Sequence, residues 1–191
     1  MARVEFDRYL FSRQLKAKAE RMATPRLRQM IAVFSEHTGA EIDGDLDRVM
    51  ATMNPDPIFF VHHPSGDSGP KGWDAVKAMY ADMFATRMNY MEMDYQRIVV
   101  DDDTVMVEFK QRKIIPGRML APGSSWAAVV EAGGETVDPN AYYLSQGRAV
   151  VIAPFDAECR MLGEHSFGGP KPIVRRLTPQ EMPADYAEGA A

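Results

Sequence analysis

Two adjacent histidines, His62 and His63, follow a short apolar segment and are the residues of this sequence best suited to proton transfer. Imidazole has an ordinary pKa of about 6.5, so it takes up and returns a proton near neutral pH without a cofactor. Residues 58–61 are β-branched or aromatic, which indicates a strand of limited length. Neighbouring strand residues point to opposite faces, so one cavity receives only one histidine of the pair. His63 shares its parity with Phe59 and Val61, and we take it as the candidate general base.

Two more histidines lie on elements that could reach the same cavity. His37 belongs to an expected helix and falls on its apolar stripe, with Leu27, Met30, Ile31 and Phe34. An apolar pocket lowers the pKa of an unpaired histidine and keeps it neutral. His165 shares its parity with Met161 and Phe167 on a late strand and could enter the cavity, although a structural role is more common for such a residue. For each histidine the alternative is a hydrogen-bonded interior or surface residue without a chemical role.

The elements that must position these residues can be read from periodicity and turn signals. After His63, a stretch rich in proline and glycine ends regular structure, and an amphipathic helix begins at Trp73. Thr24 and Asp45 are the expected caps of two earlier helices, and residues 4–22 form a further one. The expected strands are residues 90–100, 105–110, 126–130, 148–155 and 160–167. Helices followed by strands predict an α+β fold with a helix-covered antiparallel sheet.

The domain organisation that follows is an N-terminal helical arm over 1–23, a domain over 24–168 and a C-terminal tail over 169–191. The tail is rich in proline and small residues, which predicts an arm or partial disorder.

Composition limits the class of protein. The net charge of −5 argues against a nucleic-acid partner, which requires a basic face. Cys159 is the single cysteine, so no internal disulfide forms and a reducing compartment is expected. The charged N-terminus and the lack of long apolar runs predict a cytoplasmic protein without a membrane partner. The four histidines lack the spacing of metal ligands, so neither a metal nor another cofactor is expected.

Three stretches carry a resemblance to a known superfamily: GDLDRVMATMNPDPIFF, GPKGWDAVKAMYADMF and FDAECRMLGEHSFGG. Together with the order of elements, residues 24 to 168 resemble the SnoaL-like or nuclear transport factor 2-like superfamily. It includes ketosteroid isomerases, scytalone-type dehydratases and polyketide cyclases. The resemblance implies a cystatin-like cone, in which a bent antiparallel sheet carries helices on its concave face. It also implies a homodimer, because such proteins usually bury the outer sheet face against a second copy.

The resemblance also suggests roles for individual residues. In ketosteroid isomerases the general base precedes a Pro-x-Gly, a position that matches His63 here. The oxyanion donor of that family matches His37, and the tyrosine that supports this donor matches Tyr80. The family's second donor, a carboxylic acid, falls at Val151, so the residue set is more similar to that of the dehydratases, which use paired histidines and a tyrosine.

These observations predict a cofactor-independent lyase that acts on a small apolar, aromatic or phenolic compound by dehydration or by retro-aldol, deformylating cleavage. An isomerase or cyclase of the same fold would use the same residues. A non-catalytic ligand-binding domain or an oxygenase small subunit is the alternative from another class. The expected walls of the substrate pocket are Phe59, His62, Tyr90, Tyr95, Phe109, Trp126 and His165.

Overall fold

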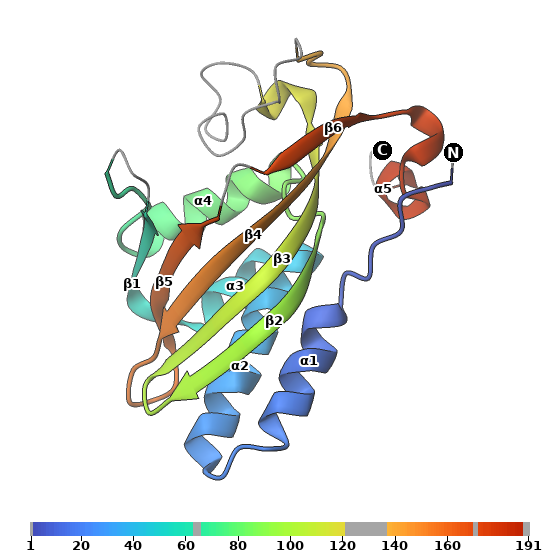
Figure 1. Cartoon of the computed structure of the whole chain (residues 1–191). Coiled ribbons are helices and arrows are strands. Elements are labelled where there is room, and N and C mark those ends of the chain that lie inside the picture. The colour runs from blue at the N-terminus through green and yellow to red at the C-terminus, as the bar shows by residue number, and fades with distance from the viewer. Residues whose placement is uncertain (1, 63–65, 121–136, 170–171, 189–191) are drawn as a thin grey trace.

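The computed structural model of the chain describes residues 2–62, 66–120, 137–169 and 172–188. Its helices are α1 (Leu10–Ala19), α2 (Pro25–Asp43), α3 (Leu46–Ala51), α4 (Trp73–Ala85) and α5 (Ala184–Glu188). Its strands are β1 (Met53–His62), β2 (Met91–Asp101), β3 (Thr104–Pro116), β4 (Tyr142–Pro154), β5 (Met161–Gly168) and β6 (Ile173–Leu177) (Figure 1).

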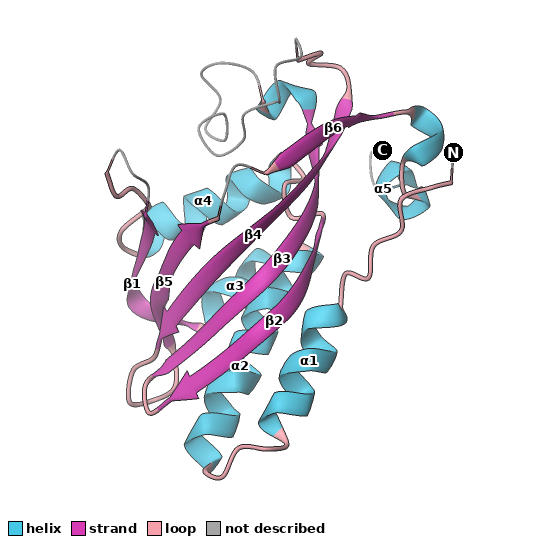
Figure 2. Cartoon of the chain, in the orientation of Figure 1, coloured by secondary structure: helices cyan, strands magenta, loops and turns pink. Residues whose placement is uncertain are grey.

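The strands form one twisted and bent sheet in the order β1-β5-β4-β3-β2, with β6 added to β4. Helices α1 to α4 lie against one face of this sheet (Figure 2). The α+β class is therefore confirmed. One pairing differs from the expected antiparallel pattern, because β1 runs parallel to β5 while the other pairs are antiparallel.

The helix boundaries follow local capping chemistry. The Thr24 side chain accepts a hydrogen bond from the Leu27 amide at the start of α2, and the Asp45 side chain accepts one from Arg48 at the start of α3. Gly44 ends α2 with φ of 74°, a left-handed conformation that favours glycine. The N-terminal helix is shorter than expected, since α1 begins at Leu10 and not near Val4.

The main core fills the space between the helices and the sheet. It is rich in methionine and aromatic side chains, including Phe34, Met53, Met83, Met91 and Phe109. Burial of such side chains is the largest favourable contribution to folding. This interior is also where the candidate site lies.

A second apolar cluster occupies the opposite face of the sheet. Its buried members are Tyr90, Ile114, Leu144, Leu177 and Tyr186, with Val4 and Phe6 packed against them. The C-terminal stretch expected as an arm thus adds β6 to the sheet and packs α5 beside it. The backbone amide of Val4 donates to the carbonyl of Glu181 at 2.8 Å, which joins the two ends of the described chain.

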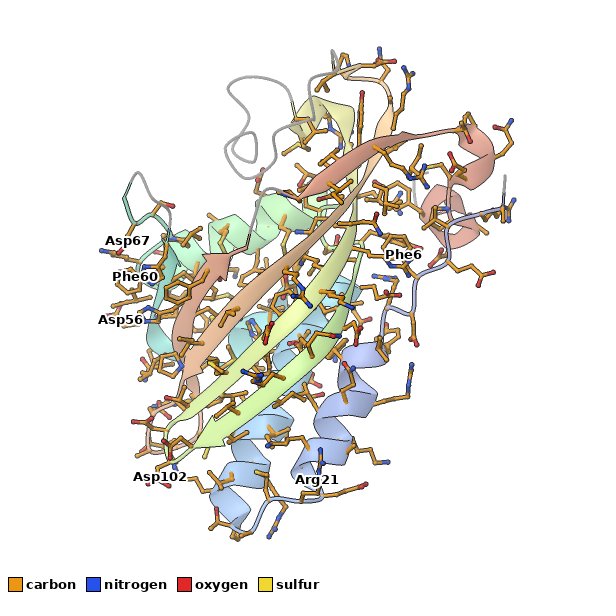
Figure 3. All side chains as sticks on the ribbon, in the orientation of Figure 1. Phe6, Arg21, Asp56, Phe60, Asp67 and Asp102 are labelled. Carbon is orange, nitrogen blue, oxygen red and sulfur yellow. The ribbon has the colours of Figure 1, made fainter. Side chains whose placement is uncertain are left out.

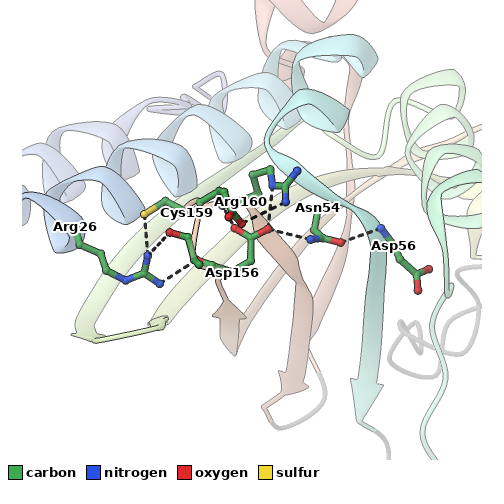
Figure 4. Close-up of polar contacts among 8 residues, drawn as sticks. Arg26, Asn54, Asp56, Asp156, Cys159 and Arg160 are labelled. Atoms are coloured by element: carbon green, nitrogen blue, oxygen red, sulfur yellow. Dashed lines mark hydrogen bonds and ion pairs between the residues drawn. The ribbon is translucent and has the colours of Figure 1, made fainter.

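The guanidinium of Arg26 anchors the start of α2 to two turns of the sheet. It donates to the carbonyl oxygens of Asp102, Asp156 and Ala157 at 2.8 to 3.0 Å, and its Nη1 lies 3.2 Å from Cys159 Sγ (Figure 4). The Asp156 carboxylate accepts hydrogen bonds from Asn54 and Arg160. This network fixes one end of the sheet relative to the helices that cover it.

Candidate active site between the helices and the sheet

His37 is completely buried on the inner stripe of α2, and both of its ring nitrogens have partners. Nδ1 lies 2.8 Å from the hydroxyl oxygen of Thr52, and that hydroxyl donates to the carbonyl oxygen of Val49 at 2.6 Å. A hydroxyl has one proton to give, so His37 must carry its proton on Nδ1 and donate it to Thr52. In this neutral tautomer Nε2 accepts the hydrogen bond from the Tyr80 hydroxyl at 2.9 Å. Burial lowers the pKa of His37 to about 4, so the ring is neutral at pH 7.

Glu164 of β5 is the charged neighbour of this histidine. Its Oε1 lies 3.6 Å from His37 Nε2, and its side chain is 16% exposed. Burial, with the carboxyl of Glu41 nearby, raises the pKa of Glu164 to about 8. A buried carboxyl with this pKa is mostly protonated at neutral pH and can act as a proton donor.

Glu41 and Lys113 complete the polar group of the interior. Glu41 lies one helical turn after His37 on α2, and burial raises its pKa to about 7, a rise that the charge of Lys113 opposes. Burial lowers the pKa of Lys113, whereas Glu41 favours the charged form. The positive charge of one lysine can offset the negative charge of one carboxylate, and the charge of Lys113 acts on Glu41. The second carboxyl, Glu164, is therefore the one that keeps its proton.

Aromatic side chains line the interior around these groups. The rings of Phe59 and Tyr80 meet edge to face with their centroids 6.0 Å apart. The rings of Tyr95 and Phe109 meet in the same way, with centroids 5.8 Å apart. Burial raises the pKa of Tyr80 and of Tyr95, which keeps both phenols protonated. The interior thus combines apolar walls with a neutral imidazole and two coupled carboxyls that titrate near neutrality.

The structure brings together some of the predicted site residues. The expected contact between His37 and Tyr80 is present, and Phe59, Tyr95 and Phe109 belong to the same core. His37 accepts a hydrogen bond at Nε2 from Tyr80 and donates from Nδ1 to Thr52, so neither ring nitrogen is left to donate to an oxyanion, and its expected part as the oxyanion donor is not supported. His63 and Trp126 lie outside the described residues.

Three predicted pocket residues lie elsewhere. Tyr90 packs in the second apolar cluster and donates a hydrogen bond to Asp185, because it precedes the inward-facing Met91 and points to the opposite side. His62 follows the same rule, since it alternates with the inward-facing Phe59 and stacks on Phe167. The expectation that these two residues line the interior was wrong.

His165 was also expected inside, and the reason for its displacement is a bulge at Gly163. This glycine has φ of 128°, and a Cβ built on it would lie 1.9 Å from the carbonyl oxygen of Ile58. The bulge shifts the alternation of β5 by one residue. Met161 and Glu164 therefore both face the interior, while His165 faces outward and meets His62.

Sequence reasoning missed Glu41, Glu164 and Lys113, although two of them left a signal. Glu41 continues the inner stripe of α2 at the spacing that follows Phe34 and His37. Lys113 shares its parity with the buried Val107 on β3. A charged residue at an inward position is uncommon unless it has a partner, which makes such positions candidates for function.

Within the described part of the chain, no group of three or more histidine, cysteine, aspartate or glutamate side chains is arranged to hold a metal ion. Among the same residues, no helix combines the length and apolar character needed to cross a bilayer.

Comparison with solved structures shows the same architecture in several proteins. A putative SnoaL-like polyketide cyclase from a Jannaschia species is 15% identical with a TM-score of 0.56, over 78% of this chain and 90% of its own. A protein from Mycobacterium tuberculosis is 13% identical with a TM-score of 0.54, over 82% of this chain and 100% of its own. A nuclear transport factor 2-like protein from Anabaena variabilis is 12% identical with a TM-score of 0.52, over 79% of this chain and 96% of its own. At these identities the likeness shows the fold.

No curated protein sequence matches the chain. The family model of the SnoaL-like domain matches residues 27–138, which include α2 from Leu27 onward, α3, α4 and the strands β1 to β3. The match covers more than half of the chain and includes His37, Glu41, Tyr80 and Lys113. This chain belongs to the SnoaL-like domain family.

Proposed function

We propose that this protein is a cofactor-independent lyase that acts by general acid–base catalysis on a small, apolar, aromatic or phenolic compound. The observation that carries the proposal is the Glu164 carboxyl, 3.6 Å from the neutral His37 imidazole in an apolar interior. Its pKa of about 8 keeps a transferable proton available near neutral pH.

In a dehydration, a base removes a proton from carbon, the carbon–oxygen bond breaks, and the leaving oxygen takes up a proton to depart as water. Glu164 is suited to supply that second proton, because it holds one at neutral pH and its side chain is partly accessible. His63 is the proposed base, on the strength of its sequence position after β1. His37 and Tyr80 are positioning residues whose hydrogen bond orders the polar part of the interior beside Glu164.

In a deformylating, retro-aldol cleavage, the base removes the proton of a primary alcohol, and the carbon–carbon bond breaks to release formaldehyde. The electron pair left on the other carbon is stabilised by the aromatic system and then takes up a proton. The same acid and base can perform both reactions, and the aromatic side chains Phe59, Tyr95 and Phe109 provide a surface for the ring of the substrate.

An isomerase or cyclase is the second candidate, since one solved neighbour is described as a putative polyketide cyclase. Proton removal and return by the same groups would move a double bond or close a ring without loss of water or formaldehyde. The mass of the product therefore separates the two candidates.

The test is a panel of phenolic and other aromatic alcohols, followed by mass spectrometry and by a formaldehyde assay. Product with the mass of water or formaldehyde removed supports the lyase, and product of unchanged mass supports the isomerase or cyclase. Glu164→Gln should abolish most turnover in either case, with Glu158→Gln as the exposed control. Tight binding of these compounds without any product would instead favour a ligand-binding domain.

A homodimer is proposed as the assembly, on the resemblance to the superfamily and on the exposed apolar residues of the sheet, Val99 and Phe167 among them. Light scattering at micromolar concentration tests it, and a monomer mass would contradict it.

A further inference from the structure

Four ring side chains form a cluster on the outer face of the sheet, which we call the outer ring cluster: Phe60 and His62 of β1, His165 and Phe167 of β5. The rings of Phe60 and His165 stack with their centroids 4.7 Å apart and an interplanar angle of 22°. Those of His62 and Phe167 stack with their centroids 4.2 Å apart and an interplanar angle of 13°. Each imidazole therefore has a phenyl ring against one of its faces. Figure 3 shows Phe60 and Asp67 close together beside β1.

The two imidazoles of this cluster point ring nitrogens at each other. His62 Nε2 lies 3.1 Å from His165 Nδ1, and His62 Nδ1 lies 2.9 Å from a carboxylate oxygen of Asp67. A carboxylate only accepts, so His62 carries a proton on Nδ1, and in the neutral ring the lone pair of Nε2 is directed at His165. Asp67 thus fixes the tautomer of His62.

We propose that His62 Nε2 and His165 Nδ1 bind one divalent transition-metal ion, such as Zn²⁺ or Cu²⁺. Two nitrogens on a tetrahedral zinc ion lie about 3.3 Å apart when each Zn–N distance is about 2.0–2.1 Å, and the observed separation is close to that value. A carboxylate on the far nitrogen of a ligating histidine is the usual outer partner in zinc sites. Waters complete the coordination, since the His62 side chain is 24% exposed and Asp67 is 54% exposed.

Binding requires a small rearrangement with a simple proton balance. In the metal-free state the hydrogen bond between the rings uses the proton on His165 Nδ1. When the ion enters, that proton moves to His165 Nε2, so both rings stay neutral and no proton is released. The rings then turn until both lone pairs point at the ion. The stacked phenyl rings of Phe60 and Phe167 restrict each imidazole to a narrow range of planes.

The site is separate from the interior acid–base group and does not depend on the proposed function. His62 and His165 are far apart in the sequence and meet because β1 pairs with β5 in the register Phe60↔His165 and His62↔Phe167. The bulge at Gly163 is what brings His165 to the outer face. Histidine spacing along the chain therefore gives no indication of the pair.

The first test is calorimetric titration of the chelator-treated full chain with Zn²⁺. We expect one ion per chain. His62→Gln and His165→Gln should each remove measurable binding, and Asp67→Asn should weaken it by roughly 10-fold or more, as loss of an outer partner does. Asp47→Asn, an exposed aspartate on α3, should leave the affinity unchanged. Circular dichroism and melting curves establish that each variant is folded.

A second measurement identifies the ligands directly. Electron paramagnetic resonance of the Cu²⁺-loaded protein should show coupling to two imidazole nitrogens in the wild type, and this signal should be absent in His165→Gln. Unchanged Zn²⁺ affinity in both folded histidine variants would overturn the site. A stoichiometry of one ion per two chains would overturn its assignment to a single chain, and so would coupling to a single nitrogen in the wild type.

Discussion

Tyr80 and His37 share a hydrogen bond of 2.9 Å, and its proton belongs to the tyrosine. Thr52 fixes this direction, because its hydroxyl already donates to Val49 and can only accept from His37 Nδ1. A buried neutral imidazole that accepts at Nε2 is poorly suited to stabilise an oxyanion by itself. It is well suited to hold the phenol and to face the acidic proton of Glu164.

The two positioning residues should differ in their effect on turnover. His37→Ala leaves the Tyr80 hydroxyl without its acceptor and the Thr52 hydroxyl without its donor, and we expect turnover to fall about 10²-fold, as misplacement of a positioned group does. Tyr80→Phe removes one hydrogen bond and should cost less. Steady-state kinetics on the substrate found in the panel measures both. If Tyr80→Phe costs more than His37→Ala, the phenol itself contacts the reacting oxygen.

His63→Ala tests the proposed base. Loss of a general base should lower turnover by roughly 10²-fold or more while the fold stays intact. Glu158→Gln, an exposed change on the turn between β4 and β5, serves as the control. Full activity of His63→Ala would exclude this histidine and leave Glu41 as the group to test next.

The rate of the reaction should depend on pH in a direction that follows from Glu164. Its pKa is raised to about 8, so the protonated acid is present below that pH and is lost above it. Turnover should therefore fall on the alkaline side, near pH 8, and on the acid side as His63 becomes protonated. In Glu164→Gln the residual activity should lose the alkaline limb. If the fall in turnover on the alkaline side persists in this variant, a group other than Glu164 causes it.

Folding stability gives a test of Glu164 that needs no substrate. The pKa rises from 4.5 to about 8 on folding, so between these values the folded state holds a proton that the unfolded state has released. The free energy of unfolding of the wild type should then fall, relative to Glu164→Gln, as pH rises through that window. The difference should be of the order of a few kcal/mol or less. Urea denaturation at pH 5 and pH 8 measures it, and parallel changes in both proteins would contradict the raised pKa.

Arg26 should contribute to stability through its contacts with the turns of the sheet. Arg26→Met removes hydrogen bonds to three carbonyl oxygens, and we expect the free energy of unfolding to fall by about 1–3 kcal/mol. Arg21→Met is the matched control. Arg21 is exposed, and among the described residues its side chain donates a hydrogen bond only to the carbonyl oxygen of Ala17, one helical turn earlier. Equal urea midpoints for the two variants would show that the Arg26 network adds no stability.

The sequence predicted elements well where the signal was local. The caps at Thr24 and Asp45 involve residues that are three positions apart, and the helix from Trp73 follows from its apolar spacing. The alternation of β3 likewise places Val105, Val107 and Phe109 inward, as their burial shows.

The candidate site was harder to predict because its composition depends on strand register. A single bulge at Gly163 places Glu164 at the inner face in place of His165, and the isolated glycine within the strand is the one local signal of this change in parity. The inward positions of Glu41 and Lys113 follow from the periodicity of α2 and β3, but a charged residue on an apolar stripe does not by itself reveal its partner. Tail residues 173–177 join the sheet by pairing with β4, a contact between segments about thirty residues apart that composition alone does not reveal.

The contact between Val4 and Glu181 has a consequence for local opening. The N-terminal segment is held by this backbone bond and by the edge-to-face contact of Phe6 with Tyr90, which Tyr186 also covers. Neither end can leave the sheet without exposing the apolar surface beneath the other. We therefore expect the two ends to open as one cooperative unit, with the amide of Val4 and those of β6 exchanging with solvent at similar rates.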